Sequence, residues 1–221
     1  MNVFVLCPGR CGSKTFVKAC SHITNWTSGH ETRVNPTKRL SINDEYEALN
    51  YNRINYPDNH IEVDCRLTWF LGFLDEVYED NALYVNLTRN RAPCAMSWSE
   101  RWGNPVNILW WWVKDVHQNH EYLLEEETRE RAMRIMQFAL EYVDATDALI
   151  RMFLKDKTNT MSFPIEDAAD LFPVFWERIG AKGNIKAALK VFNRTTKRQR
   201  QLGRRQYLND WQDKFTNKSS I

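Results

Sequence analysis

The sequence predicts an α/β fold in which a mostly parallel β-sheet carries helices on both faces and the C-terminal half is helical. Short runs predicted to form buried strands occur at residues 3–6, 60–63 and 81–88, and the first of them is entirely apolar. After each run comes a turn, and then a segment with helical periodicity. The length of 221 residues and an apolar share of 43% suit one domain with a complete core.

The N-terminal segment combines an apolar run, a glycine-containing turn and a helix start, an arrangement typical of phosphate binding. The run Val3–Leu6 breaks at residues 7–9, and a helix is expected over about Ser13–Cys20. Gly9 and Gly12 allow the backbone to curl, so that successive N–H groups point inward toward an anion. The fold is therefore expected to be P-loop-like.

The side chains of this loop also favour an anion. Arg10 and Lys14 supply two cationic groups, and Ser13 and Thr15 supply two hydroxyl donors. The nearest nucleotide-binding template is G-x-x-x-x-G-K-[ST], but Pro8 and Ser13 stand at its two glycine positions. This departure disfavours an ordinary nucleoside triphosphatase. A tight strand-to-helix turn with surface charges is the structural alternative.

A second polar loop follows the apolar run at 81–88. Arg89 and Ser97 are eight residues apart, and Pro93 marks the start of a helix between them. A guanidinium fork and a hydroxyl on one face of a helix suit a second phosphate group. Ser99 is the alternative hydroxyl if the helix is turned slightly.

Together the two loops resemble the sulfotransferases that use 3′-phosphoadenosine-5′-phosphosulfate. The segment "RCGSKT" matches the family's 5′-phosphosulfate loop, and Arg89 and Ser97 match its 3′-phosphate pair, although Arg91 replaces the usual proline. The resemblance implies this nucleotide as cofactor, with adenosine 3′,5′-bisphosphate as product. It also implies nucleotide contacts from both loops and from a basic C-terminal segment: Gly9, Arg10, Cys11, Gly12, Ser13, Lys14, Thr15, Arg89, Ser97, Arg194 and Lys197.

The segment "GHETR" resembles the Gly-Glu-Glu-Thr-Arg segment of tyrosylprotein sulfotransferases, whose second glutamate is the general base. This role falls on Glu31, which follows Arg10 by 21 residues (31 − 10). His30 is the alternative base, because cytosolic sulfotransferases use a histidine. Arg66 is the nearest candidate for the family lysine that neutralises the transferring group. Arg10 and Lys14 complete the implied catalytic set.

The other segments are assigned from their patterns. We expect a short strand near residues 23–27, an irregular or short helical segment at 41–58, and helices at about 67–79, 122–142 and 144–156. A last strand at about 160–163, followed by Glu166 and Asp167, is similar to a strand of bacterial sulfotransferases. His117 and His120 lack an acidic or cysteine partner in register, so no metal site is predicted.

The C-terminal region is strongly basic. Residues 182–205 contain nine Lys or Arg and no Asp or Glu, a pattern usual for a solvated helix face. By the resemblance, Arg194, Lys197 or Arg198 would instead close the 3′-phosphate site. The expected organisation is one domain, with a nucleotide-binding core at about 1–103 and a helical closing part at about 104–216.

Composition and charge restrict the expected partners and location of the protein. A net charge of +2 does not predict a nucleic-acid partner, and no apolar run is long enough to span a membrane. The five scattered cysteines suggest reduced thiols and a cytoplasmic location. The acceptor and the oligomeric state are left open by the sequence.

Two other functions are compatible with the sequence. A P-loop nucleotide kinase or triphosphatase would use Lys14 and Thr15 on the phosphates, with Asp64 at a strand end as the Mg²⁺ partner. A non-catalytic protein could bind a polyanion through the basic C-terminal region.

Overall fold

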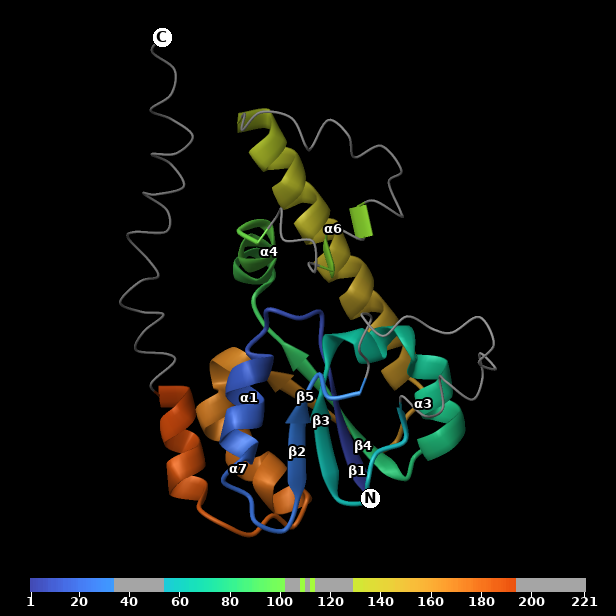
Figure 1. Ribbon diagram of the computed structural model, residues 1–221, viewed down its shortest axis with the longest axis vertical. Coiled ribbons are helices and arrows are strands. Elements are labelled where there is room, and N and C mark those ends of the chain that lie inside the picture. The colour runs from blue at the N-terminus through green and yellow to red at the C-terminus, as the bar shows by residue number, and fades with distance from the viewer. Residues whose placement is uncertain (34–53, 102–107, 110–111, 114–128, 194–221) are drawn as a thin grey trace.

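Five parallel strands form a single sheet in the computed structural model, which describes residues 1–33, 54–101, 108–109, 112–113 and 129–193 (Figure 1). Their order is β2-β3-β1-β4-β5, so the first strand lies at the centre. The predicted α/β class with a parallel sheet is confirmed. The strands are β1 (Asn2–Leu6), β2 (Thr27–His30), β3 (His60–Val63), β4 (Ala82–Thr88) and β5 (Thr160–Pro164).

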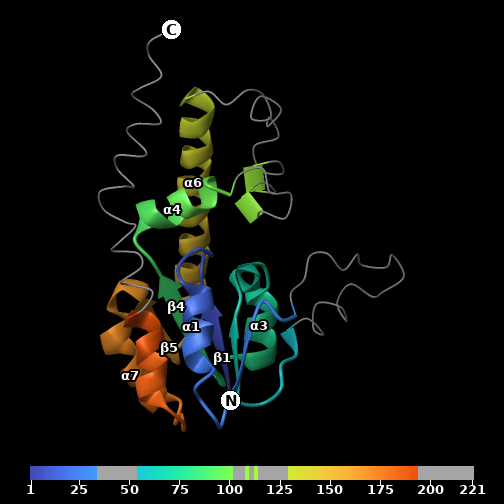
Figure 2. The same cartoon turned by 60° about the vertical axis from the view of Figure 1, so that its left-hand side comes forward.

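Helices cover both faces of the sheet, as the alternation of buried side chains in β1 requires. Val3 and Val5 face a core formed with α1 (Ser13–Cys20), α7 (Ala168–Arg178) and residues 185–193. Phe4 and Leu6 face the opposite core, formed with the 3₁₀ helix η1 (Cys65–Trp69), α3 (Leu71–Tyr78) and the C-terminal half of α6 (Arg129–Leu154). Figure 2 shows α1 and α3 beside the sheet. The fold is thus a three-layer α/β/α arrangement.

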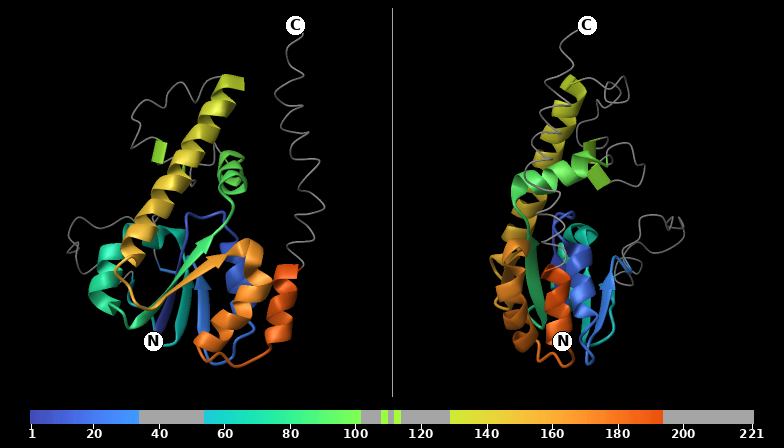
Figure 3. Two further views of the ribbon diagram at one scale, coloured as in Figure 1. Left: turned by 180° about the vertical axis from the view of Figure 1, so that it is seen from behind. Right: turned by 90° about the vertical axis from the view of Figure 1, so that its left-hand side faces the viewer.

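A helical layer extends beyond the carboxyl ends of the strands. The helix α4 (Arg91–Ser99) packs against the N-terminal half of α6, which rises well above the sheet (Figure 3). Its core consists of side chains from three segments: Cys94, Ala95, Trp98, Leu109, Val113, Ile135, Ala139, Tyr142 and Val143. This layer places α4 over the loop that follows β1.

Three elements differ from the sequence prediction. The second strand is Thr27–His30 rather than 23–27, because Ile23 forms an isolated antiparallel bridge with Gly183. The helix expected at 67–79 is divided, since the Asp64 side chain accepts a hydrogen bond from the Arg66 amide and starts a 3₁₀ turn. The two helices expected between residues 122 and 156 form one described helix, α6.

The sheet order places a switch point at the first loop. The chain leaves β1 through α1 toward β2 on one side, whereas it leaves β4 through α4 and α6 toward β5 on the other. β1 and β4 are direct neighbours. Open α/β sheets bind ligands at the carboxyl ends of two such strands. Both predicted anion loops lie at this position.

Some predictions concern segments outside the described residues. They include most of the 41–58 segment, His117, His120, and the basic residues Arg194 and Lys197. Within the described ranges, no helix combines the length and apolar character needed to cross a bilayer.

Replacing Gly29 in β2 with alanine should destabilise the fold. An added Cβ would lie 2.4 Å from Thr32 Cγ2 and 2.8 Å from Glu62 Oε2, so the Thr32 side chain and the buried Glu62 carboxylate would have to move. Overpacking of this kind costs about 1–3 kcal/mol, measurable by chemical denaturation. Gly72→Ala is the matched control, because nothing lies within 4 Å of its added Cβ in α3. Equal stability of the two variants would contradict the prediction.

Candidate functional site

The loop between β1 and α1 has a tightly curled backbone. Gly9, Arg10 and Gly12 have positive φ angles of 78°, 57° and 94°. A Cβ at Gly9 would lie 2.6 Å from the Trp98 ring, and one at Gly12 would lie 2.7 Å from Ile165 Cγ1. Both positions therefore require glycine, for the close approach as well as for the conformation.

Side chains of residues 89–98 donate hydrogen bonds to the backbone carbonyl groups of this loop. Three consecutive carbonyl groups accept hydrogen bonds: Pro8 from Trp98 Nε1 at 3.1 Å, Gly9 from Cys94 Sγ at 3.2 Å, and Arg10 from Arg89 Nη1 at 3.1 Å. In a trans peptide the N–H group points away from the carbonyl group. The N–H groups of Arg10 and Cys11 are therefore directed away from α4.

The amide groups at the start of α1 fit an anion. The N-cap Gly12 offers no side chain, and its carbonyl accepts from the amides of Thr15 and Phe16, at 2.9 Å each. Among the residues that the structure describes, no hydrogen-bond acceptor is found for the amides of residues 10–14. Donors of this kind at the positive end of a helix suit a phosphate group.

The second loop brings further positive charge to the first. Arg10 Nε donates to Ser97 Oγ at 2.9 Å. Burial lowers the pKa of the Arg10 guanidinium, and repulsion from Arg101 and Arg89 lowers it further. Ser99 donates its hydroxyl to the Met96 carbonyl of its own helix at 2.9 Å, so Ser97 is the hydroxyl that faces the loop.

Arg101 is a cationic residue near the loop that the sequence analysis did not single out. It follows the end of α4 at Ser99, and repulsion from its guanidinium lowers the pKa of Arg10, so the two side chains lie near one another. Three guanidinium groups, from Arg10, Arg89 and Arg101, therefore gather beside the loop. Their mutual repulsion favours a bound anion. No local pattern in the sequence indicated that Arg101 lies near Arg10.

His30 and Glu31 lie at the end of β2 next to the start of α1. His30 Nε2 is 3.0 Å from Ser13 Oγ and 3.9 Å from Glu31 Oε1. Burial lowers the pKa of His30, although the Glu31 carboxylate opposes this shift. Lys14 also acts on the imidazole, by lowering its pKa. The structure therefore brings His30, one of the two predicted bases, to the start of α1, and Glu31 lies beside it.

Arg66 has a partner that the sequence did not reveal. Its Nε donates to Asp64 Oδ1 at 3.0 Å and its Nη2 to Asp64 Oδ2 at 2.9 Å. Nη2 also lies 3.9 Å from Glu31 Oε2. Both members of the Asp64–Arg66 pair are buried. Two of the three guanidinium nitrogens thus donate hydrogen bonds to Asp64, and one of these two is also close to the Glu31 carboxylate.

One cluster near Arg66 has the composition of a metal site. Ligand atoms of Glu31, Asp64 and Cys65 lie within 4.8 Å of one another. However, the Arg66 guanidinium already compensates Asp64. Burial raises the pKa of the Cys65 thiol well above its usual value, which disfavours the thiolate that a metal needs. The cluster is therefore better suited to its arginine than to a divalent cation.

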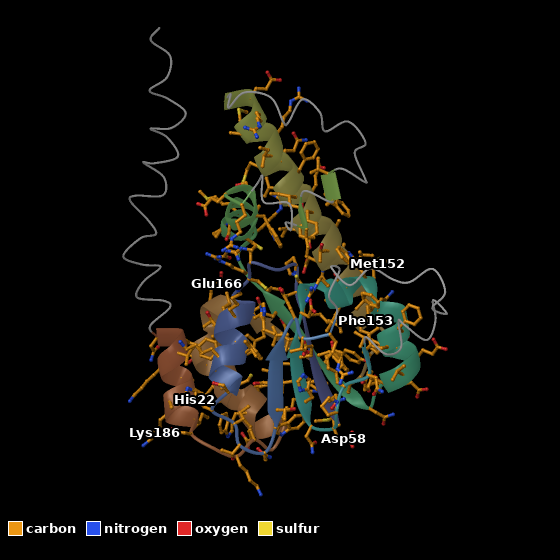
Figure 4. The ribbon with its side chains drawn as sticks, viewed as in Figure 1. His22, Asp58, Met152, Phe153, Glu166 and Lys186 are labelled. Carbon is orange, nitrogen blue, oxygen red and sulfur yellow. The ribbon has the colours of Figure 1, made fainter. Side chains whose placement is uncertain are left out.

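The remaining predicted residues occupy different environments. The Cys11 side chain is fully buried beside Cys7, so only its amide can contact a ligand. Lys14 is exposed at the first turn of α1, and Thr15 is half-buried. Glu166, near the base of α4 in Figure 4, accepts a hydrogen bond from the Asn90 amide at 2.9 Å and so connects the 3₁₀ turn Ile165–Asp167, which follows β5, to the second loop.

No family model, curated protein or solved structure matches this chain.

Proposed function

We propose that this protein transfers a sulfuryl group from 3′-phosphoadenosine-5′-phosphosulfate to a hydroxyl or amine of an acceptor. A bond forms between the acceptor atom and sulfur, and the bond between sulfur and the 5′-phosphate oxygen breaks. The acceptor's proton passes to a base on the protein. Adenosine 3′,5′-bisphosphate is the second product. By analogy with phosphoryl transfer, the protein acts by positioning the groups and stabilising charge.

The contact between the two anion loops supports this proposal most strongly. Arg10 Nε lies 2.9 Å from Ser97 Oγ, and Arg89 Nη1 lies 3.1 Å from the Arg10 carbonyl. A nucleotide with anionic groups on both its 3′ and 5′ sides needs two neighbouring anion sites. These contacts join a loop whose amides have no acceptor among the described residues to a cluster of guanidinium groups.

Each residue would have a separate role in the reaction. The amides of residues 10–14 would bind the 5′-phosphate, and Lys14 and Arg10 would neutralise charge that develops on its oxygens. Arg89, Ser97 and Arg101 would bind the 3′-phosphate. Glu31 would accept the proton, since its side chain is 41% exposed and therefore accessible to an acceptor. His30 would hold the base next to α1 through Ser13.

The kinase alternative needs a carboxylate for Mg²⁺ at a strand end. Asp64 occupies such a position after β3, but it is fully buried and both of its oxygens accept hydrogen bonds from Arg66. Magnesium would have to displace a buried guanidinium. The arrangement therefore favours group transfer in which arginine and lysine side chains supply the positive charge.

Calorimetry with two nucleotides tests the proposal. Adenosine 3′,5′-bisphosphate should bind without a divalent cation and should raise the melting temperature, whereas ATP with Mg²⁺ should bind weakly. Arg101→Ala should weaken binding of the bisphosphate by about 1.5 kcal/mol, the scale of one hydrogen bond to a charged group. It should hardly change binding of adenosine 5′-monophosphate.

Arg91→Ala is the matched control, since Arg91 begins α4 and pairs with Asp144 of α6. It should leave both affinities unchanged. Tighter binding of ATP, with a requirement for Mg²⁺, would favour the kinase. Equal losses of affinity for adenosine 3′,5′-bisphosphate and adenosine 5′-monophosphate in Arg101→Ala would show that Arg101 does not bind the 3′-phosphate.

A further inference from the structure

We propose that the side chains of Thr27, His60, Glu62 and Thr32 form a clamp across β2 that positions Glu31, with Glu62 as the central positioning residue. The inference rests on the proposed function, because it concerns the residue assigned there as the base. The clamp itself is defined by hydrogen bonds that join β3 to Thr27 in β2 and to Thr32, which follows β2.

Glu62 is fully buried, yet its carboxylate has several hydrogen-bond donors. Oε1 accepts from the Thr32 amide at 2.8 Å, and Oε2 accepts from Thr32 Oγ1 at 2.6 Å. His60 Nε2 lies 2.9 Å from Oε2. A buried carboxylate is stabilised only by such a complete set of partners, and loss of one donor is costly.

The chain of contacts reaches both ends of β2. His60 Nδ1 lies 2.8 Å from Oγ1 of Thr27, the first residue of the strand. Thr32, at the other end, follows the last residue of the strand by two positions. Between them, Gly29 pairs with Glu62 in the sheet and approaches its carboxylate closely. The clamp therefore binds a short polar strand that has little apolar side chain of its own.

Glu31 lies between the strand and the clamped Thr32. Its φ angle is 56°, a left-handed conformation that is unfavourable for glutamate and that persists only where neighbours enforce it. Its amide donates to the Val63 carbonyl at 3.2 Å, and Thr32 is held through both its amide and its hydroxyl. These bonds determine where the Glu31 carboxylate lies relative to His30 and Arg66.

Thr32→Val tests the clamp, because it removes one hydrogen bond and retains the shape and every charge. With 4-nitrophenol as the probe acceptor, turnover should fall by about 10- to 100-fold, the scale expected for a misplaced group. The affinity for adenosine 3′,5′-bisphosphate should stay unchanged. Thr32→Ser retains the hydroxyl and should restore turnover. Loss of thermal stability with unchanged turnover in Thr32→Val would mean a purely structural role.

A second measurement does not depend on activity. The Glu31 carboxylate raises the pKa of His30, while Glu62, Lys14 and Arg66 are the other charged groups that act on it. If Thr32→Val displaces Glu31, the His30 pKa should fall in a titration followed by NMR, and Thr32→Ser should retain the wild-type value. The His30 resonance is identified from its absence in His30→Gln.

The two measurements separate the two proposals. An unchanged His30 pKa in Thr32→Val would overturn the clamp, whether or not the protein transfers sulfuryl groups. A lowered pKa in a protein that neither binds the bisphosphate nor sulfates the probe would support the clamp and contradict the proposed function.

Discussion

Replacing Glu31 with glutamine should lower the rate of sulfuryl transfer by about 10²- to 10⁴-fold, the usual contribution of a general base. Glutamine keeps the size of the side chain but cannot accept the proton. The affinity for adenosine 3′,5′-bisphosphate should stay near the wild-type value, because neither anion loop includes Glu31. The rate is measured as release of the bisphosphate from 3′-phosphoadenosine-5′-phosphosulfate, and the affinity by calorimetry.

His30→Ala is the matched comparison at the neighbouring position. It removes the contact with Ser13 Oγ at 3.0 Å and leaves the carboxylate in place, so only a mild loss of rate is expected. The opposite pattern, with a large loss in His30→Ala and a small one in Glu31→Gln, would transfer the role of base to the histidine. Burial lowers the pKa of His30, which leaves its imidazole able to accept a proton at neutral pH.

Arg66→Ala should reduce the free energy of unfolding by about 3–5 kcal/mol near neutral pH, because it leaves Asp64 as an unpaired buried charge. The deficit should shrink as the pH falls. Burial raises the pKa of Asp64 from 3.8 to about 6 even beside Arg66, so the neutral carboxyl favours the folded state. This stabilisation is complete at pH values below 3.8, the pKa of Asp64 in the unfolded chain. It is lost as the pH rises through the pKa of Asp64 in the folded protein.

Urea denaturation of the wild type and Arg66→Ala over a range of pH checks this expectation. In the variant the guanidinium no longer favours ionisation, so Asp64 takes up its proton more readily as the pH is lowered. Arg91→Ala removes the arginine of an exposed pair and should show little pH-dependent loss. A deficit in Arg66→Ala that stays constant or grows toward low pH would contradict the explanation.

The two central strands β1 and β4 were predictable because parallel strands buried on both faces read as nearly continuous apolar runs. The structure confirms strands at His60–Val63 and ending at Thr88, and a helix at Ser13–Cys20. The positions of the two polar loops were predictable for a related reason. Each follows a buried strand directly, so its polar side chains must lie at the carboxyl edge of the sheet.

β2 was misplaced because its stability comes from another strand. The sequence "TSGH" has no apolar alternation, and its side chains depend on His60 and Glu62 of β3. Those two residues looked like ordinary members of a buried strand. Pairing between distant segments leaves no local pattern, and the same limitation hid the packing of Arg101 near Arg10.

The pairing of Arg66 with Asp64 also could not be predicted from the local sequence. A carboxylate two residues earlier was visible in the sequence, but the bidentate geometry depends on how the 3₁₀ turn of η1 orients both side chains. Sequence position alone could not decide whether the guanidinium faces a ligand or Asp64.

The burial of all five cysteines gives the folded chain a chemical property of its own. Cys7, Cys11 and Cys94 lie in or against the loop between β1 and α1, and burial raises the pKa of the Cys94 thiol to about 12. A thiol reagent can therefore attack them only when the surrounding layers separate. The rate of alkylation of these three cysteines therefore measures how often the structure opens around this loop, without any added label.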